Sequence, residues 1–152
     1  TPLGRELKEV LDSGELVNDE LMIELIRDRL SRGDTIPGFI LDGFPRTMAQ
    51  AEALDDLLRD LDRSLDVVFE FQVPQREQLL DRLLKRAELE NRADDTPDAI
   101  GRRLELYDRE TAPLVEYYRS TRGNVVGIHA DRTVDEVFHE IQDSLQSVEA
   151  RA

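Results

Sequence analysis

The chain has 152 residues, of which 39% are hydrophobic and 5% aromatic, enough for one folded domain with its own core. Acidic residues outnumber basic ones by 34 to 20, which gives a net charge of −14 and argues against a nucleic-acid or anionic-membrane partner. No apolar run approaches the roughly 20 residues of a membrane span, and the sequence has no cysteine for disulfides or thiolate metal sites. Thr1–Val10 is charged and has no apolar stretch, so we expect no signal peptide there. We expect a cytoplasmic monomer.

Lysine and arginine are used unequally. Lys8 and Lys85 are the only lysines, so the other 18 of the 20 basic residues are arginines. This bias fits a GC-rich genome or a salty cytoplasm. It also fits a site that grips phosphate, because the planar guanidinium makes paired hydrogen bonds with anionic oxygens. Composition leaves both interpretations open.

The first part of the chain favours helices around one short strand. Apolar spacing and capping residues predict three helices, at Leu3–Asp12, from Asn18 to just before Gly33, and from Thr47 to about Leu61. Thr47 with Gln50 three residues later is a capping-box pattern. Between the last two helices, the run GFILD at Gly38–Asp42 is typical of a buried parallel strand, and Gly43–Arg46 is expected to turn.

The second part alternates strands and helices. Strands are predicted at Asp66–Val73 and Asn124–Ala130, and helices after Pro74, from Thr96 to about Arg119, and after Thr133. Pro113 should kink the long helix, and Thr133 with Glu136 is a second capping-box pattern. Glu88–Asp95 has little apolar content and is expected to be an exposed loop. The order ααβαβααβα predicts a parallel sheet with helices on both faces.

The end of the first predicted strand is the best candidate for chemistry. Ligands of such sheets bind beyond the carboxyl ends of the strands. Asp42 stands where phosphoryl-transfer enzymes place a magnesium-associated carboxylate, Gly43 lets a ligand approach the backbone, and Arg46 can fork onto phosphate. A strand-end turn with a helix-capping carboxylate would give the same pattern.

The joined string Gly38–Thr47, GFILDGFPRT, resembles the signature of adenylate kinases. The resemblance continues in order along nearly the whole chain, at Gly14–Val17, Asp19–Leu21, Arg92–Thr96, Arg102–Leu104, Thr111–Leu114 and Tyr117–Tyr118. Thr47 favours adenylate kinase over the related uridylate-cytidylate kinases, which tend to have Asn there.

The resemblance implies a P-loop-kinase-like three-layer sandwich, with residues 1–152 as one domain, 1–33 as an AMP-binding helical segment and 86–96 as a short lid. It also implies the reversible reaction of MgATP with AMP to give two ADP. The AMP side would be formed by Glu15, Leu16, Val17, Gly43, Phe44, Pro45, Arg46 and Gln50. Arg92 and Arg103 would reach the phosphates between the nucleotides, Arg82, Arg86 and the backbone of Arg132 would contact ATP, and Asp42 would order the water around Mg²⁺. Arg46, Arg86, Arg92 and Arg103 are the expected catalytic residues. The short lid without cysteine excludes a structural zinc there.

The chain departs from the family in one respect. No GxxxxGK[ST] P-loop is present, since Lys8 and Lys85 stand in other contexts. The resemblance also implies that these residues lack the first strands of the family's sheet. We therefore expect residues 1–152 alone to be inactive. Three interpretations stay open: an active adenylate kinase with a P-loop segment upstream of Thr1, a non-catalytic AMP-site remnant or gene fragment, and another nucleoside-monophosphate kinase.

Overall fold

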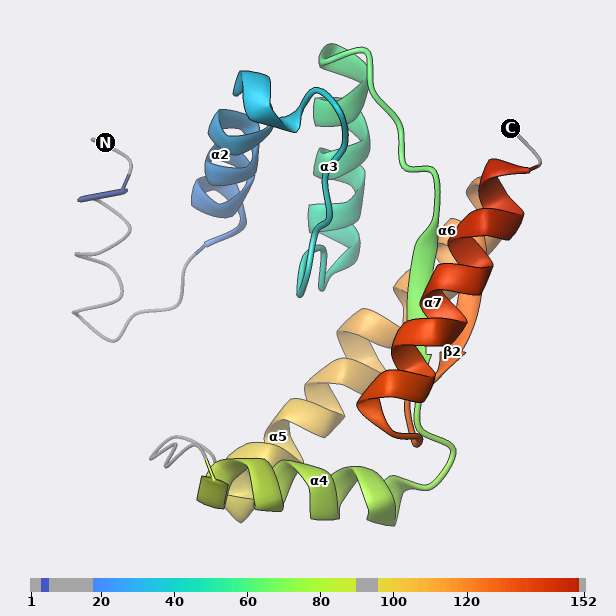
Figure 1. Ribbon diagram of the computed structural model, residues 1–152. Helices are drawn as coiled ribbons and strands as arrows, with labels where there is room; N and C mark the ends of the chain where they lie inside the picture. Colours follow the sequence, from blue (N-terminus) through green and yellow to red (C-terminus); the bar gives the residue numbers. More distant parts are fainter. Residues whose placement is uncertain (1–3, 6–17, 90–95, 151–152) are drawn as a thin grey trace. The chain divides into compact units, whose positions relative to one another are not determined.

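The computed structural model of the protein describes residues 4–5, 18–89 and 96–150, and the chain divides into two units (Figure 1). Unit 1 spans Thr1–Ser64 and unit 2 spans Leu65–Ala152. Unit 1 is helical in its described part, whereas unit 2 holds the sheet. Most of the helix predicted at Leu3–Asp12 lies outside the described residues.

Two helices with predicted caps form the body of unit 1. Helix α2 spans Asp19–Leu30, and the side chain of Asn18 accepts a hydrogen bond from the Leu21 N–H at 2.8 Å, as the sequence predicts. Helix α3 spans Met48–Asp60 after Thr47 as N-cap. Apolar residues of both helices are buried and form the core of this unit: Leu21, Leu30, Ala51, Leu54, Leu57 and Leu58.

Helix α3 ends in a Schellman motif. The N–H of Arg63 donates to the Leu58 carbonyl at 2.8 Å, and the N–H of Asp62 donates to the Arg59 carbonyl at 3.1 Å. Asp62 takes the left-handed conformation, with φ of 53°, which is the position where helices usually place glycine. The turn leads the chain from α3 toward the end of α2.

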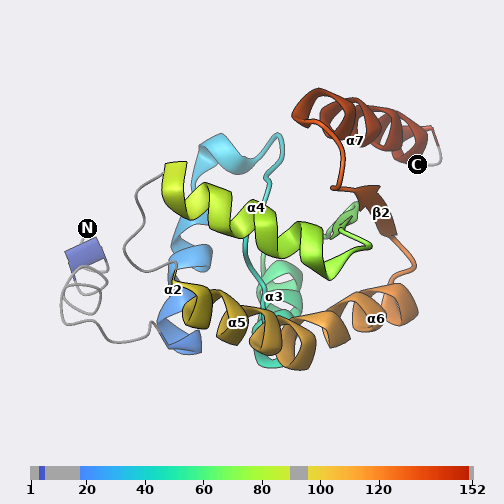
Figure 2. The ribbon, with the colours of Figure 1, turned by 90° about the horizontal axis from the view of Figure 1, so that it is seen from below.

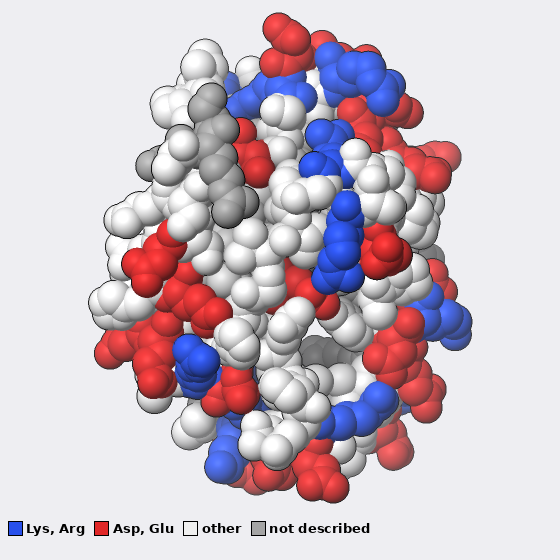
Figure 3. Space-filling view, turned by 90° about the vertical axis from the view of Figure 1, so that its right-hand side faces the viewer, with Lys and Arg blue, Asp and Glu red and all other residues white. Residues whose placement is uncertain are grey.

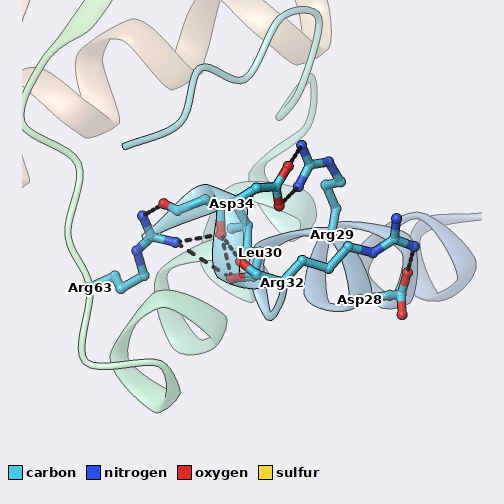
Figure 4. Close-up of polar contacts among 7 residues, drawn as sticks. Asp28, Arg29, Leu30, Arg32, Asp34 and Arg63 are labelled. Carbon is cyan, nitrogen blue, oxygen red and sulfur yellow. Dashed lines mark hydrogen bonds and ion pairs between the residues drawn. The ribbon is translucent and has the colours of Figure 1, made fainter. Parts of the chain in front are cut away.

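Arg63, in the turn after α3, extends its side chain to the C-terminal end of α2 and the residues that follow it (Figure 4). Its guanidinium donates to the hydroxyl of Thr35 at 3.2 Å and to the Leu30 carbonyl at 3.5 Å, and lies 4.6 Å from the centre of the Phe39 ring. Thr35 is buried and follows Gly33 in a short 3₁₀ helix, Gly33–Thr35. We call these contacts of Arg63 with Leu30, Thr35 and Phe39 the Arg63 anchor.

The strand predicted at Gly38–Asp42 is wrong. The segment is irregular, and Ile40 is 93% exposed. A strand needs a neighbour to pair its backbone groups, but both described strands belong to unit 2 and pair with each other. The apolar run therefore becomes an extended connection between the Arg63 anchor and α3.

The sheet of unit 2 is parallel, as predicted. Strand β1, Val68–Gln72, pairs with β2, Val125–His129, in a register that places Phe71 opposite Ile128. Helices α6, Ala112–Thr121, and α7, Val134–Glu149, lie on opposite sides of the strands (Figures 1 and 2). Helix, sheet and helix thus form the three layers expected from the element order. Ile128, Leu114 and Tyr118 are buried between them.

Two further helices complete unit 2. Helix α4 spans Arg76–Leu89, so Glu88 and Leu89, which were predicted to begin an exposed loop at Glu88–Asp95, are helical instead. Residues 90–95 lie outside the described part. Helix α5 spans Pro97–Leu106, and Thr96 caps it by accepting from the Ala99 N–H at 3.2 Å.

The break expected at Pro113 takes the form of a π-helical segment at Tyr107–Thr111, between α5 and α6. Pro113 lacks the N–H that an α-helix would use, and its ring would crowd the carbonyl four residues earlier. The wider π turn precedes the proline and separates the two helices.

Acidic and basic side chains are interspersed over the face in Figure 3. Several arginines are paired with neighbouring carboxylates, such as Arg29 with Asp34 at 2.9 Å and Arg32 with Asp28 at 2.6 Å (Figure 4). Both pairs are solvent-exposed, so they contribute little to stability. Within the described residues, none of the helices is long and apolar enough to cross a membrane.

Candidate functional site

The turn Gly43–Arg46 in unit 1 is closed by its own arginine. Gly43 has φ of 74°, and the Arg46 Nε donates to the Gly43 carbonyl at 2.7 Å. A Cβ at Gly43 would lie 2.9 Å from the Arg46 Nη2, so glycine provides both the conformation and the space. Asp42 and Arg46 are exposed. The turn therefore presents the Arg46 guanidinium on the surface of unit 1, four residues after the exposed Asp42 carboxylate.

Gln50 ties this turn to two helices. Its backbone N–H donates to the Thr47 hydroxyl at 3.2 Å, which is the predicted N-cap contact. The other half of the predicted capping box is wrong, because the Gln50 Oε1 accepts from the Arg46 N–H at 2.7 Å instead of from Thr47. The Gln50 Nε2 donates to the Asp19 carboxylate at 2.7 Å. One side chain thus connects the turn, the start of α3 and the start of α2.

In unit 2, Arg82 of α4 contacts the loop that follows β2. The guanidinium donates to the backbone carbonyl of Ala130 and, at 3.3 Å, to that of Arg132. The sequence predicts both arginines on the ATP side but predicts no contact between them. The structure brings the side chain of one to the backbone of the other, so Arg82 holds the loop from the α4 side.

Glu140 of α7 holds the same loop from the other side, and sequence reasoning missed it. Its carboxylate accepts from the His129 N–H at 3.2 Å, lies 2.7 Å from the His129 Nδ1, and lies 4.0 Å from the Arg132 Nη1. The hydrogen bond from His129 is the main cause that lowers the pKa of the Glu140 carboxyl. The only signal in the sequence that could have pointed to Glu140 is its spacing from Glu136, one helical turn earlier, after a capping-box pattern.

The capping box at Thr133 is confirmed and starts α7 directly after this loop. Thr133 accepts from the Glu136 N–H at 3.3 Å, and the Glu136 carboxylate accepts from the Thr133 N–H at 2.9 Å. The hydrogen bonds with Thr133 lower the pKa of Glu136. The loop at 130–133 is thus fixed at its end by a cap, as well as by Arg82 and Glu140 at its sides.

The remaining candidate residues are described only in part. Arg86 lies one turn after Arg82 on α4 and is half-buried. Arg103 lies in α5, but its side chain is outside the described part. Glu15, Leu16, Val17 and Arg92 lie outside the described residues, as does most of the predicted lid at 86–96.

In the described part of the chain, no group of three or more His, Asp and Glu side chains is arranged so that it could hold a metal ion. An open pocket lies along α7 near Glu140, but its lining mixes acidic and basic side chains: His129, Arg132, Glu136, His139, Glu140 and Asp143.

The chain is similar in sequence to known adenylate kinases. It matches the family model described as adenylate kinase over residues 1–123. Adenylate kinase of Micrococcus luteus is 44% identical over 148 residues, which are 97% of this chain and 71% of the relative. That of Cyanothece sp. is 47% identical over 142 residues, 93% of this chain and 72% of the relative.

This chain belongs to the adenylate kinase family. The resemblance of the GFILDGFPRT string is thereby confirmed, and with it the assignment to a family of phosphotransferases. Adenylate kinase of Bifidobacterium longum, at 45% identity, is covered over 77% of its length. These three adenylate kinases are therefore longer than the 152 residues of this chain. The family implies ATP, AMP and ADP as substrates, with Mg²⁺ accompanying ATP.

Proposed function

We propose that this chain supplies the AMP-side and ATP-side contacts for the reversible reaction of MgATP with AMP to give two ADP. Unit 1 would bind AMP through the turn Gly43–Arg46 and Gln50. Unit 2 would bind ATP through α4 and the loop after β2. Phosphoryl transfer depends mainly on positioning and on stabilising charge, and the arginines of both units provide fixed positive charge for it.

On the AMP side, the Arg46 guanidinium would bind the AMP phosphate. The proposal is supported by the turn itself, because the bond from the Arg46 Nε to the Gly43 carbonyl holds an exposed guanidinium in one place. Arginine is suited to this role since its planar fork pairs with two phosphate oxygens. The backbone at Glu15, Leu16 and Val17 and the side chain of Gln50 would contact the remainder of the nucleotide.

On the ATP side, we propose different tasks for two arginines of α4. Arg82 donates to the carbonyls of Ala130 and Arg132, so it would shape the loop whose backbone contacts adenine. Arg86, one turn along, would reach the ATP phosphates at the entrance of the lid. Arg92 and Arg103 would stabilise the charge that develops on the transferred phosphoryl group.

Magnesium would enter with ATP as part of the substrate. Asp42 is an exposed single carboxylate next to Gly43. One carboxylate fits the task of ordering the water shell of a metal that phosphate oxygens already hold, and it does not fit an all-protein cage. Asp42 would therefore orient MgATP by hydrogen bonds to metal-bound water.

The exposed Arg46 in its closed turn is the observation that carries the proposal, and calorimetry with AMP tests it. The protein from the complete reading frame that contains residues 1–152 is compared with its Arg46→Ala and Arg59→Ala variants. Arg59 is the matched control, since it is an exposed arginine of the same unit, paired with Asp56 at 2.8 Å.

We expect Arg46→Ala to weaken AMP binding at least ten-fold, because a charge-assisted contact contributes roughly 1.5–3 kcal/mol. Arg59→Ala should leave AMP affinity unchanged. Equal AMP affinity in the two variants would contradict the proposed AMP side. We also propose that the protein acts as a cytoplasmic monomer, without a nucleic-acid or membrane partner.

A further inference from the structure

The Gln50 carboxamide is held at both ends. Its Oε1 accepts from the backbone N–H of Arg46 at 2.7 Å, and its Nε2 donates to the Asp19 Oδ1 at 2.7 Å. Asp19 is the first residue of α2 and lies 31 positions before Gln50 in the sequence. An exposed residue of one helix therefore decides how a side chain of the next helix is oriented.

The two partners of Gln50 allow one orientation of the amide. A backbone N–H can only donate, and an ionised carboxylate can only accept. If the amide rotated by half a turn, its NH₂ would face the Arg46 N–H and its oxygen would face the Asp19 carboxylate. Both hydrogen bonds would be replaced by repulsive pairs, so the oxygen stays toward Arg46 and the nitrogen toward Asp19.

The orientation matters because it decides where the remaining hydrogen-bond donor and acceptor of the amide point. After these two bonds, one N–H remains on Nε2 and one lone pair remains on Oε1. An adenine edge presents a 6-amino donor beside a ring-nitrogen acceptor, which matches a carboxamide oxygen beside an N–H. A 6-oxopurine presents an acceptor at position 6 beside a protonated N1, which is the reverse order. A fixed amide can therefore match one kind of purine and oppose the other.

We propose that Asp19 is a positioning residue that sets the purine preference of the AMP side by fixing the orientation of the Gln50 carboxamide. This inference rests on the proposed function, in which Gln50 contacts the bound nucleotide. Asp19 itself does not touch the nucleotide. It acts through Gln50, and it favours a 6-aminopurine over a 6-oxopurine.

The test compares Asp19→Ala with Glu20→Ala in the protein from the complete reading frame. Glu20 is the next residue of α2, is also exposed, and also lies in the acidic first turn. The two variants thus lose the same charge at the same helix end, but only one loses the contact with Gln50. Affinity for AMP and for IMP, which differ at purine position 6, is measured by calorimetry.

We expect Asp19→Ala to lower the ratio of AMP affinity to IMP affinity by roughly ten-fold, because a charge-assisted hydrogen bond no longer opposes the rotated amide. Glu20→Ala should keep the ratio of the unchanged protein. The side-chain NH₂ resonances of Gln50 in ¹⁵N–¹H spectra give a second readout that does not depend on turnover. One of these protons should be protected from exchange in the unchanged protein and in Glu20→Ala, and exposed in Asp19→Ala.

A Gln50→Ala variant separates the contact of Gln50 with the nucleotide from the role of Asp19. If Gln50→Ala binds AMP as well as the unchanged protein does, the proposed contact of Gln50 with the nucleotide is overturned. If Gln50→Ala weakens AMP binding while Asp19→Ala and Glu20→Ala give the same AMP-to-IMP ratio, the role of Asp19 alone is overturned. Unprotected Gln50 NH₂ protons in the unchanged protein would overturn it as well.

Discussion

Gly43 shows how a single residue shapes the turn that we propose as the AMP side. Its φ of 74° is a conformation that glycine adopts without strain, and the Arg46 guanidinium occupies the space where a side chain would be. The loop and the arginine therefore depend on each other: the glycine admits the guanidinium, and the guanidinium closes the turn through the Gly43 carbonyl.

Gly43→Ala should destabilise the fold by about 1 kcal/mol, because a Cβ is strained at positive φ, and should also weaken AMP binding by displacing Arg46. Gly33→Ala is the control, since a Cβ at Gly33 meets nothing within 4 Å. Urea unfolding and AMP calorimetry on both variants measure the two effects. Equal unfolding midpoints for the two variants would contradict this account of the turn.

Glu140 predicts a pH dependence of stability. Its hydrogen bond from His129 lowers the carboxyl pKa below the ordinary value of 4.5. A carboxyl whose pKa is lower in the folded state stabilises the fold above its unfolded pKa, and this stabilisation is lost as the pH falls through the folded pKa. Asp34, hydrogen-bonded by Arg29, and Glu136 have lowered pKa values too and contribute in the same pH range.

Stability should therefore fall as the pH drops below about 4.5, and Glu140→Gln should make this fall shallower without abolishing it. Glu88→Gln removes one charge from the exposed end of α4 and serves as the control. Thermal unfolding between pH 3 and pH 7 is the measurement. An identical pH profile for Glu140→Gln and the unchanged protein would mean that the contact with His129 does not persist in solution.

At the scale of elements, local signals in the sequence predicted the helix starts well. Asn18, Thr96 and Thr133 each cap the helix that they were expected to cap, because an N-cap contact spans only three residues. Local signals of this kind could not decide whether Gly38–Asp42 forms a strand. Whether an apolar run becomes a strand depends on a neighbouring strand far along the chain, and this run has none among the described residues.

The Schellman motif that ends α3 makes a prediction about Asp62. Because Asp62 has φ of 53°, Asp62→Gly should stabilise the protein by about 0.5–1 kcal/mol, whereas Asp62→Ala should destabilise it. Aspartate tolerates the left-handed conformation better than alanine but less well than glycine. Urea unfolding should thus rank the three proteins in the order Gly, Asp, Ala. Any other order would show that the motif does not form in solution.

At the scale of the whole molecule, the contacts of the candidate site explain why the sequence predicted the residues but not their arrangement. Gln50 meets Asp19 across 31 positions, and Arg82 meets Arg132 across 50. Such contacts leave no periodic trace in the sequence. The family motif predicts which side chains form the site, whereas only the fold shows that Arg82 and Glu140 hold one loop from two sides.

The lack of a P-loop motif predicts the behaviour of these 152 residues as an isolated polypeptide. Backbone amides and a lysine of that motif hold the ATP phosphates in P-loop enzymes, and neither Lys8 nor Lys85 stands in such a motif. We expect no measurable ADP from ATP and AMP in a coupled assay. The product of the complete reading frame is assayed beside it, and turnover by residues 1–152 at a comparable rate would contradict the expectation.

The Arg63 anchor has a consequence for the thermodynamics of ligand binding. The segment between Phe39 and Arg46 is fixed at one end by Arg63 and at the other by Gln50. Its loss of conformational entropy therefore belongs to folding and is not repeated when a nucleotide arrives. Preorganisation of this kind would let the proposed AMP-binding turn bind a small phosphate ester without ordering a loop in the same step.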